Sequence, residues 1–376
     1  MPANRRAQGE ETTLADRKRR AGQRIIMGLE GPGLTADERQ LIRELRPGGF
    51  ILFARNVVEP AQVRELNREL ASLLPDRFPP LLSVDQEGGR VLRVKNTRWP
   101  AMRTVGNIGQ VPVTRQVAAA MADELRAMGF NLNFAPVADV DSNPRNPVIG
   151  DRSFGRDPAE VARHVVAFAA GQQAHGVIAC VKHFPGHGDT DVDSHKALPV
   201  VDKDVRDLAH MELIPFDAAV RAGIDMVMTS HVLFPALDDD HPATMSRAVL
   251  HGLLRDRLDF KGVVISDDLE MKAVRDRWDI RTVLDKASRA SVDLFCIGRS
   301  FEHDLTLTVQ AWEALIRLQE EEKRHHKRAE TSMRRLRALR EKHLRPDTPP
   351  PDLSVVGSTA FQALAAQLHS RGAGVA

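Results

Sequence analysis

Short apolar runs, rich in residues that favour β-strands, recur along the chain with segments of helical period between them. Eight runs are found: residues 24–30, 48–54, 80–85, 131–137, 177–183, 225–231, 262–268 and 292–298. Several are almost continuously apolar rather than alternating, as is typical of parallel strands that are covered on both faces. The pattern therefore predicts a parallel sheet flanked by helices.

The segments between the runs carry helix signals. Thr35 and Glu38 form a capping box at the start of one predicted helix. A second apolar stripe, from Val117 to Met128, stops at Gly129, which is a common residue just after a helix. Eight alternations of strand and helix predict an α/β fold, a (β/α)8 TIM-type barrel, with a doubly wound open sheet as the alternative.

Polar residues at the ends of the runs favour the barrel. Five of the eight runs end in, or lead to, a potentially reactive side chain: Asp85, Asp139, Lys182 with His183, His231, and Asp267 with Asp268. The carboxyl ends of barrel strands meet at one mouth, where such enzymes build their sites. An open sheet would spread these groups along an edge.

The rest of the chain fits one domain. We expect a flexible charged leader at 1–20, the catalytic barrel at 21–345 and a proline-rich tail at 346–376 that ends in one short helix. The charged segment before the tail has a narrow apolar stripe of Met333, Leu336 and Leu339. This stripe favours a helix packed on the barrel over a nucleic-acid-binding arm.

Composition narrows the choice of partners and compartment. The formal net charge is only +2, so no nucleic-acid partner is expected. The two cysteines, Cys180 and Cys296, lie in apolar runs, which favours buried, reduced thiols. We find no secretory h-region and no apolar stretch of about 18 residues, so a cytoplasmic protein without a membrane span is expected.

The stretch KHFPGHGDTDVDSH, residues 182–195, concentrates lysine, histidine and aspartate after the fifth run. Its glycines and proline predict a loop over the barrel mouth. His183 and His187 are spaced as metal ligands on a helix would be, but the proline and glycine between them remove the helical face. A polar loop whose histidines satisfy backbone groups is another interpretation.

Asp193 and His195 lie two residues apart at the end of this stretch. In an extended segment both side chains point to the same side. The carboxylate can then fix the tautomer of the imidazole and favour its protonated form, which is a general acid/base arrangement.

The stretch ISDDLEM, residues 265–271, allows two interpretations. Asp267 followed by Glu270 is a helix-capping signature. A carboxylate at a strand end beside helix N–H groups also stays ionised, as a nucleophile must. Asp268 could then serve as the cap.

Two arginine-containing loops could bind a polar ligand. VDQEGGRVLR, residues 84–93, places Asp85 at a strand end ahead of Arg93. NPVIGDRSFG, residues 146–155 in the loop after the fourth run, offers Arg152. A carboxylate and a forked guanidinium suit vicinal hydroxyl groups, although ion pairing alone also explains such residues.

Seven motifs in order resemble glycoside hydrolase family 3, in particular its β-N-acetylhexosaminidases, over about residues 24–300. They are LRPGGFILFARNV (45–57), VDQEGGRV (84–91), NFAPVADV (133–140), GDRSFG (150–155), KHFPGHGDT with DSH (182–195), MTSHV (228–232) and SDDLEM (266–271). Leu92 departs from the glutamine common between the two arginines of the family's second motif.

The resemblance implies roles for particular residues. It makes Asp267 the nucleophile of a retaining glycosidase and His195, paired with Asp193, the acid/base on a mobile loop. Residues implied to bind the N-acetylhexosamine or line its pocket are Asp85, Arg93, Arg152, Lys182, His183, Met228 and His231. The resemblance implies no metal or organic cofactor.

The expected activity is exo-acting release of N-acetylglucosamine from muropeptides during peptidoglycan recycling. Three other functions remain open: a metal-dependent barrel hydrolase, a phosphorylase acting on the same sugar, and a non-catalytic sugar-binding protein. The joint presence of Asp267, Asp193 and His195 disfavours the last.

Overall fold

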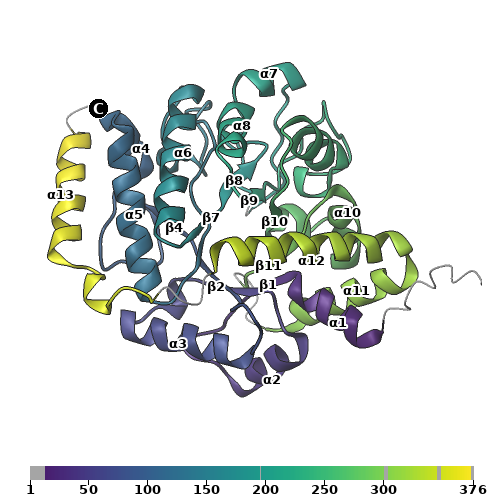
Figure 1. Cartoon of the computed structure of the whole chain (residues 1–376). Helices are drawn as coiled ribbons and strands as arrows, with labels where there is room; N and C mark the ends of the chain where they lie inside the picture. Colours follow the sequence, from purple (N-terminus) through teal and green to yellow (C-terminus); the bar gives the residue numbers. More distant parts are fainter. Residues whose placement is uncertain (1–12, 195, 300–303, 345–348, 374–376) are drawn as a thin grey trace, which may run out of the picture.

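The eight predicted runs all contain strands of one parallel sheet (Figure 1). The structure is a computed structural model that describes residues 13–373 except 195, 300–303 and 345–348. The sheet consists of β1 (Ile25–Gly28), β2 (Gly49–Leu52), β3 (Leu81–Val84), β6 (Leu132–Asn133), β7 (Ile178–Ala179), β8 (Val181–Phe184), β9 (Met226–Thr229), β10 (Val263–Asp268) and β11 (Leu294–Ile297).

The sheet closes on itself. Its order runs from β7 through β6, β3, β2, β1, β11, β10 and β9 to β8. The first and last members, β7 and β8, are separated only by Cys180 and are two halves of the fifth predicted run. Eight runs thus form one ring, which confirms the (β/α)8 TIM-type barrel. A short antiparallel hairpin, β4 (Gln86–Gly88) with β5 (Val91–Leu92), follows β3.

Helices cover the outside of the ring. They are α1 (Leu14–Gln23), α2 (Ala36–Leu45), α3 (Pro60–Leu73), α4 (Met102–Ile108), α5 (Val111–Ala127), α6 (Pro158–Ala174), α7 (Val205–His210), α8 (Leu213–Arg221), the π-helix η4 (Ala248–Arg257), α9 (Lys272–Arg275), α10 (Ile280–Ala290), α11 (Thr306–Glu321), α12 (Lys323–His343) and α13 (Thr359–Ala373). The predicted capping box of Thr35 and Glu38 begins α2. Gly129 follows α5 with a φ of 88°, a left-handed conformation that favours glycine.

Helix α12 closes the amino-terminal end of the barrel. Its Leu336 and Leu339 belong to the same buried cluster as interior residues from all eight runs. Arg340 donates a hydrogen bond to the Gly48 carbonyl just before β2, and Ser332 donates one to Asp293 just before β11. The narrow apolar stripe predicted here therefore packs against the barrel, as expected.

Both terminal segments contain more structure than their sequence indicated. Residues 14–20, predicted within a flexible leader, belong to α1, whose Arg17 and Arg20 pair with Glu320 and Glu330 of the C-terminal helices. Charge spacing alone could not reveal these partners, because they lie about three hundred residues away.

The tail ends in a helix, as predicted, but that helix is fifteen residues long and packs on the barrel. Helix α13 lies beside α4 (Figure 1). Phe361 contacts Trp99 with 5.9 Å between ring centroids, and the Gly357 N–H donates to Glu124 at 2.8 Å. These contacts attach the tail to the segment around α4 and α5.

Two other expectations concern the cysteines and the absence of a membrane span. Cys180 and Cys296 are free and buried, and burial raises the pKa of both thiols. None of the described helices has the length and apolar character needed to cross a membrane.

Candidate active site

A small cavity of about 160 Å³ opens at the carboxyl ends of the strands. Seven of the eight predicted runs, and several of the loops between them, contribute to its wall, so residues far apart in sequence meet there. Its lining residues are Ile51, Phe53, Asp85, Glu87, Val91, Arg93, Phe134, Val148, Arg152, Lys182, His183, His187, Ser194, Met228, Asp267, Asp268, Met271 and Cys296. Seven of the ten predicted site residues are in this set: Asp85, Arg93, Arg152, Lys182, His183, Met228 and Asp267.

A buried carboxylate, Glu87 of the β4 strand, organises the cations of the cavity. Arg152 binds it through two parallel contacts of 2.8 Å, and the Lys182 ammonium lies 2.6 Å from the same carboxylate. Burial opposes ionisation of Glu87, but Arg152 and Lys182 outweigh it and hold its pKa far below the ordinary range. Glu87 was not among the predicted site residues, although it lies within the VDQEGGRV motif.

Lys182 also bridges to Asp85 at the end of β3. Its Nζ lies 2.7 Å from Asp85 Oδ1, and Arg93 reaches the other carboxylate oxygen at 3.5 Å. Burial favours the neutral forms, but the two carboxylates raise the pKa of Lys182, and Lys182 with Arg93 lowers the pKa of Asp85. One wall of the cavity therefore presents fixed cations alternating with fixed carboxylates.

His183 is oriented by a second buried carboxylate, Asp139. The Nδ1 of His183 lies 2.7 Å from Asp139, and its Nε2 lies 3.4 Å from Arg152 Nη2. Burial raises the pKa of Asp139, but the His183 ring outweighs burial and the net shift is downward. Lys182 and His183 are neighbours in β8 yet both line the cavity, where the register of β8 against β9 shifts.

His187 holds the loop after β8 in place. Its Nδ1 lies 2.9 Å from Thr190 Oγ1 and its Nε2 lies 3.1 Å from Ser194 Oγ. The backbone N–H of His187 donates to Asp139 at 2.7 Å. Because both ring nitrogens are hydrogen-bonded within the loop, this arrangement leaves His187 no free nitrogen for a metal ion.

The predicted acid/base pair is only partly visible. Asp193 is half-buried in the same loop, and its carbonyl accepts from the N–H groups of residues 196 and 197. His195 lies outside the described residues. Its role, and its pairing with Asp193, remain predictions.

The ISDDLEM segment separates the two roles that its sequence allowed. Asp268 accepts hydrogen bonds from the N–H groups of Glu270 and Gly298, at 3.1 and 3.0 Å, so it satisfies the turn after β10. Asp267 precedes it in β10 and lines the cavity. Both aspartates line the cavity, and Asp267 Oδ1 also accepts from the Asp268 N–H at 2.8 Å. The hydrogen bonds that hold the turn go to Asp268, so the capping role falls mainly on that residue.

His231 and Arg90 contact segments that carry residues of the cavity wall. His231, predicted to line the pocket, is fully buried and is not among the lining residues of the described chain; it lies 2.8 Å from Thr244 Oγ1 and 3.1 Å from the Asp268 carbonyl. Its ring therefore contacts the last residue of β10. Arg90 donates to the Val148 and Ile149 carbonyls and thereby fixes the loop that carries Arg152.

Comparison with known proteins places the chain in a family. The model of the glycosyl hydrolase family 3 N terminal domain matches residues 23–338. The chain belongs to this family and is a glycoside hydrolase, as its barrel and its acid-lined mouth suggest. The resemblance predicted from the seven motifs is thus confirmed.

Named relatives make the comparison more specific. A beta-hexosaminidase of Pseudomonas aeruginosa is 40% identical over 273 residues, covering 72% of this chain and 80% of the relative. A solved family 3 beta-N-acetylglucosaminidase from Paenibacillus is 38% identical, with a TM-score of 0.87 over 94% of this chain and 68% of the other. NagZ from Neisseria gonorrhoeae, solved with N-trifluoroacetyl-D-glucosamine, is 29% identical, with a TM-score of 0.72 over 93% of this chain and 98% of the other.

Burial of His187 makes a pH dependence expected. Burial is the main cause that lowers its pKa to about 4, whereas the unfolded chain takes up the proton near the ordinary 6.5. The stabilisation from neutral His187 is present at pH 7 and is lost as the pH falls from about 6.5 toward 4. The loss amounts to about 2 kcal/mol by pH 5. Chemical unfolding at pH 7 and pH 5 should show a smaller acid-induced loss in His187→Asn than in wild type.

Exposed His210 provides the control for this measurement. His210→Asn should retain the full wild-type loss. An equal loss in His187→Asn and wild type would show that His187 does not set this pH dependence.

Proposed function

We propose that this protein is a retaining exo-β-N-acetylglucosaminidase. The observation that carries the proposal is that the Asp267 carboxylate lines the same cavity as the fixed cations Lys182 and Arg152 and several hydrogen-bonding side chains. Its relatives named as beta-hexosaminidases and beta-N-acetylglucosaminidases support the same activity. A cavity of about 160 Å³ is smaller than typical sites for drug-sized ligands and suits one terminal sugar.

Each described group has a proposed task. Asp85, Arg93 and Lys182 bind sugar hydroxyl groups, because together they offer both acceptors and donors at fixed positions. Arg152 and His183 add donors beside them. Held by Glu87 and Asp85, the cations stay charged and do not compete as nucleophiles.

The proposed reaction has two steps. Asp267 attacks the anomeric carbon while His195 protonates the departing glycosidic oxygen, which gives a covalent glycosyl-aspartate. Water then opens this intermediate with His195 as the base and Asp193 as its orienting partner. The proposed reaction requires that the loop after β8 carry His195 to the bound sugar.

We infer that the natural substrates are muropeptides and that the enzyme acts in peptidoglycan recycling in the cytoplasm. Two buried free thiols fit a reducing compartment. A pocket for a single sugar suits removal of a terminal N-acetylglucosamine. The rest of the muropeptide would then remain outside the pocket.

Asp267→Ala should abolish hydrolysis of an aryl N-acetyl-β-glucosaminide without unfolding the protein. A slow fluorosugar substrate should add its mass to the peptide that contains Asp267, detected by mass spectrometry. Asp268→Asn retains an oxygen acceptor for the turn and serves as the neighbouring control, with hydrolysis largely retained. Label on Asp268 instead of Asp267 would overturn the assignment.

His195→Ala should slow substrates with poor leaving groups far more than activated aryl substrates, because a phenolate departs without a proton. Asp193→Asn should show a weaker form of the same selectivity. The measurement is kcat/KM across a series of leaving groups of increasing pKa. A uniform loss over the series would argue against an acid/base role.

The wild-type enzyme should prefer an aryl N-acetyl-β-glucosaminide to the matching glucoside, because part of the binding energy comes from the N-acetyl group. With wall-derived disaccharides it should release N-acetylglucosamine from the terminus. A preference for the glucoside, or cleavage inside longer chains, would contradict the proposed specificity. Products formed with and without phosphate distinguish hydrolysis from phosphorolysis.

A further inference from the structure

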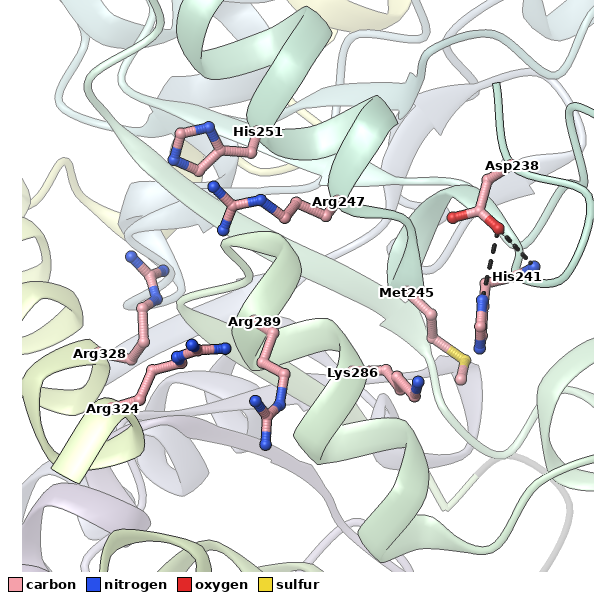
Figure 2. A pocket seen from close by; sticks show the side chains of 9 residues that line it. All are labelled: Asp238, His241, Met245, Arg247, His251, Lys286, Arg289, Arg324 and Arg328. Carbon is pink, nitrogen blue, oxygen red and sulfur yellow. Dashed lines mark hydrogen bonds and ion pairs between the residues drawn. The ribbon is translucent and has the colours of Figure 1, made fainter. Parts of the chain in front are cut away.

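A second and larger cavity lies on the side of the barrel, between η4, α10 and the start of α12 (Figure 2). Its volume is about 690 Å³, within the range of small-molecule sites. The lining residues are Asp238, His241, Met245, Arg247, His251, Lys286, Arg289, Arg324 and Arg328. None of them lines the active-site cavity, so the two sites are separate.

The charge of this basic cavity is poorly compensated. Five of its nine described lining residues are arginine or lysine, and the one carboxylate among these nine, Asp238, lies 3.4 Å from His241 Nδ1. Within the described chain, no hydrogen bond or ion pair joins Arg247, Lys286 or Arg324 to an acidic group. These three cations therefore line the cavity without an acidic partner among the residues that the structure describes.

The two remaining cations of the cavity, Arg289 and Arg328, do have acidic partners. Arg289 is neutralised, because it lies 2.6 Å from both Asp285 and Glu322. Arg328 lies 3.8 Å from Asp293, but that buried carboxylate also binds Arg255 at 2.8 Å and Arg335 at 3.1 Å. One carboxylate shared by three arginines compensates Arg328 only in part.

The uncompensated cations come from separate elements held in place by packing. Helix α10 carries Lys286 and packs against both η4 and α12. In Figure 2 the guanidinium groups of Arg247, Arg324 and Arg328 extend toward the same space between these helices. Like charges placed together around an open space repel one another, and an anion bound between them removes that repulsion.

We propose that the basic cavity binds a small ligand that carries several phosphate groups. Guanidinium groups bind phosphate oxygens through paired, charge-assisted hydrogen bonds, and several cations in one hollow require several negative charges from the ligand. A hollow of this size can accommodate a compact anion, whereas a protein partner or nucleic acid would need a broad contact surface. An inorganic oligophosphate and a nucleoside triphosphate share this chemistry.

The test uses tripolyphosphate as the probe and the full chain. Isothermal titration calorimetry at low ionic strength should show saturable binding of one tripolyphosphate per chain. The double variant Arg247→Gln with Arg324→Gln should bind at least about tenfold more weakly. Its turnover of an aryl N-acetyl-β-glucosaminide should not change, because the basic cavity is separate from the active site.

A matched double variant controls for overall charge. Arg257→Gln with Arg334→Gln also removes two exposed arginines from η4 and α12, outside the cavity, and should bind tripolyphosphate as the wild type does. Thermal unfolding of each variant checks that it is folded. Since the removed side chains are exposed, the unfolding midpoints should remain close to that of the wild type.

Further titrations identify the ligand class. Tighter binding of a nucleoside triphosphate than of tripolyphosphate would support the proposal and add a contact to the nucleoside. Absence of saturable tripolyphosphate binding would overturn it, as would equal weakening in both double variants or saturable binding of a poly-glutamate chain alone.

Discussion

The ionised carboxylate of Glu87, buried between Lys182 and Arg152, is the interaction on which the barrel mouth depends. Two cations brought into a cavity lose hydration, and without a fixed anion they would separate or lose charge. Glu87 compensates both, while Asp85 binds Lys182 from the other side. The sugar-binding groups can therefore keep their charge and position before any ligand arrives.

Barrel closure brings these groups together from distant parts of the sequence. Asp85 follows β3, Lys182 belongs to β8 and Asp267 to β10, and the ring of parallel strands places all three at one mouth. Supporting residues then fix the loops: Arg90 holds the loop that carries Arg152, and His187 holds the loop that leads to residue 195. The order of the strands thus positions the side chains at the strand ends. Loop contacts position Arg152 and the segment that leads to residue 195.

The sequence was sufficient to predict the eight strands, because buried parallel strands need long apolar runs and these stand out against charged helices. It was also sufficient to predict most of the cavity wall, because polar residues at strand ends must meet in a barrel. Glu87 escaped prediction since a glutamate in a glycine-rich turn has no local feature that reveals burial. The sequence could not show that the His231 ring contacts Thr244 and the Asp268 carbonyl, because Thr244 lies in a separate segment of the chain.

The position of α12 has a consequence for how the chain folds during synthesis. The sheet closes only when residues 294–297 pair with β1, and the barrel interior is covered at its base only when Leu336 and Leu339 arrive. Until then the emerging chain exposes apolar strand faces and an unpaired sheet edge, surfaces that are prone to aggregation. Residues as late as Leu339 must therefore be synthesised before the barrel can be closed and covered at its base.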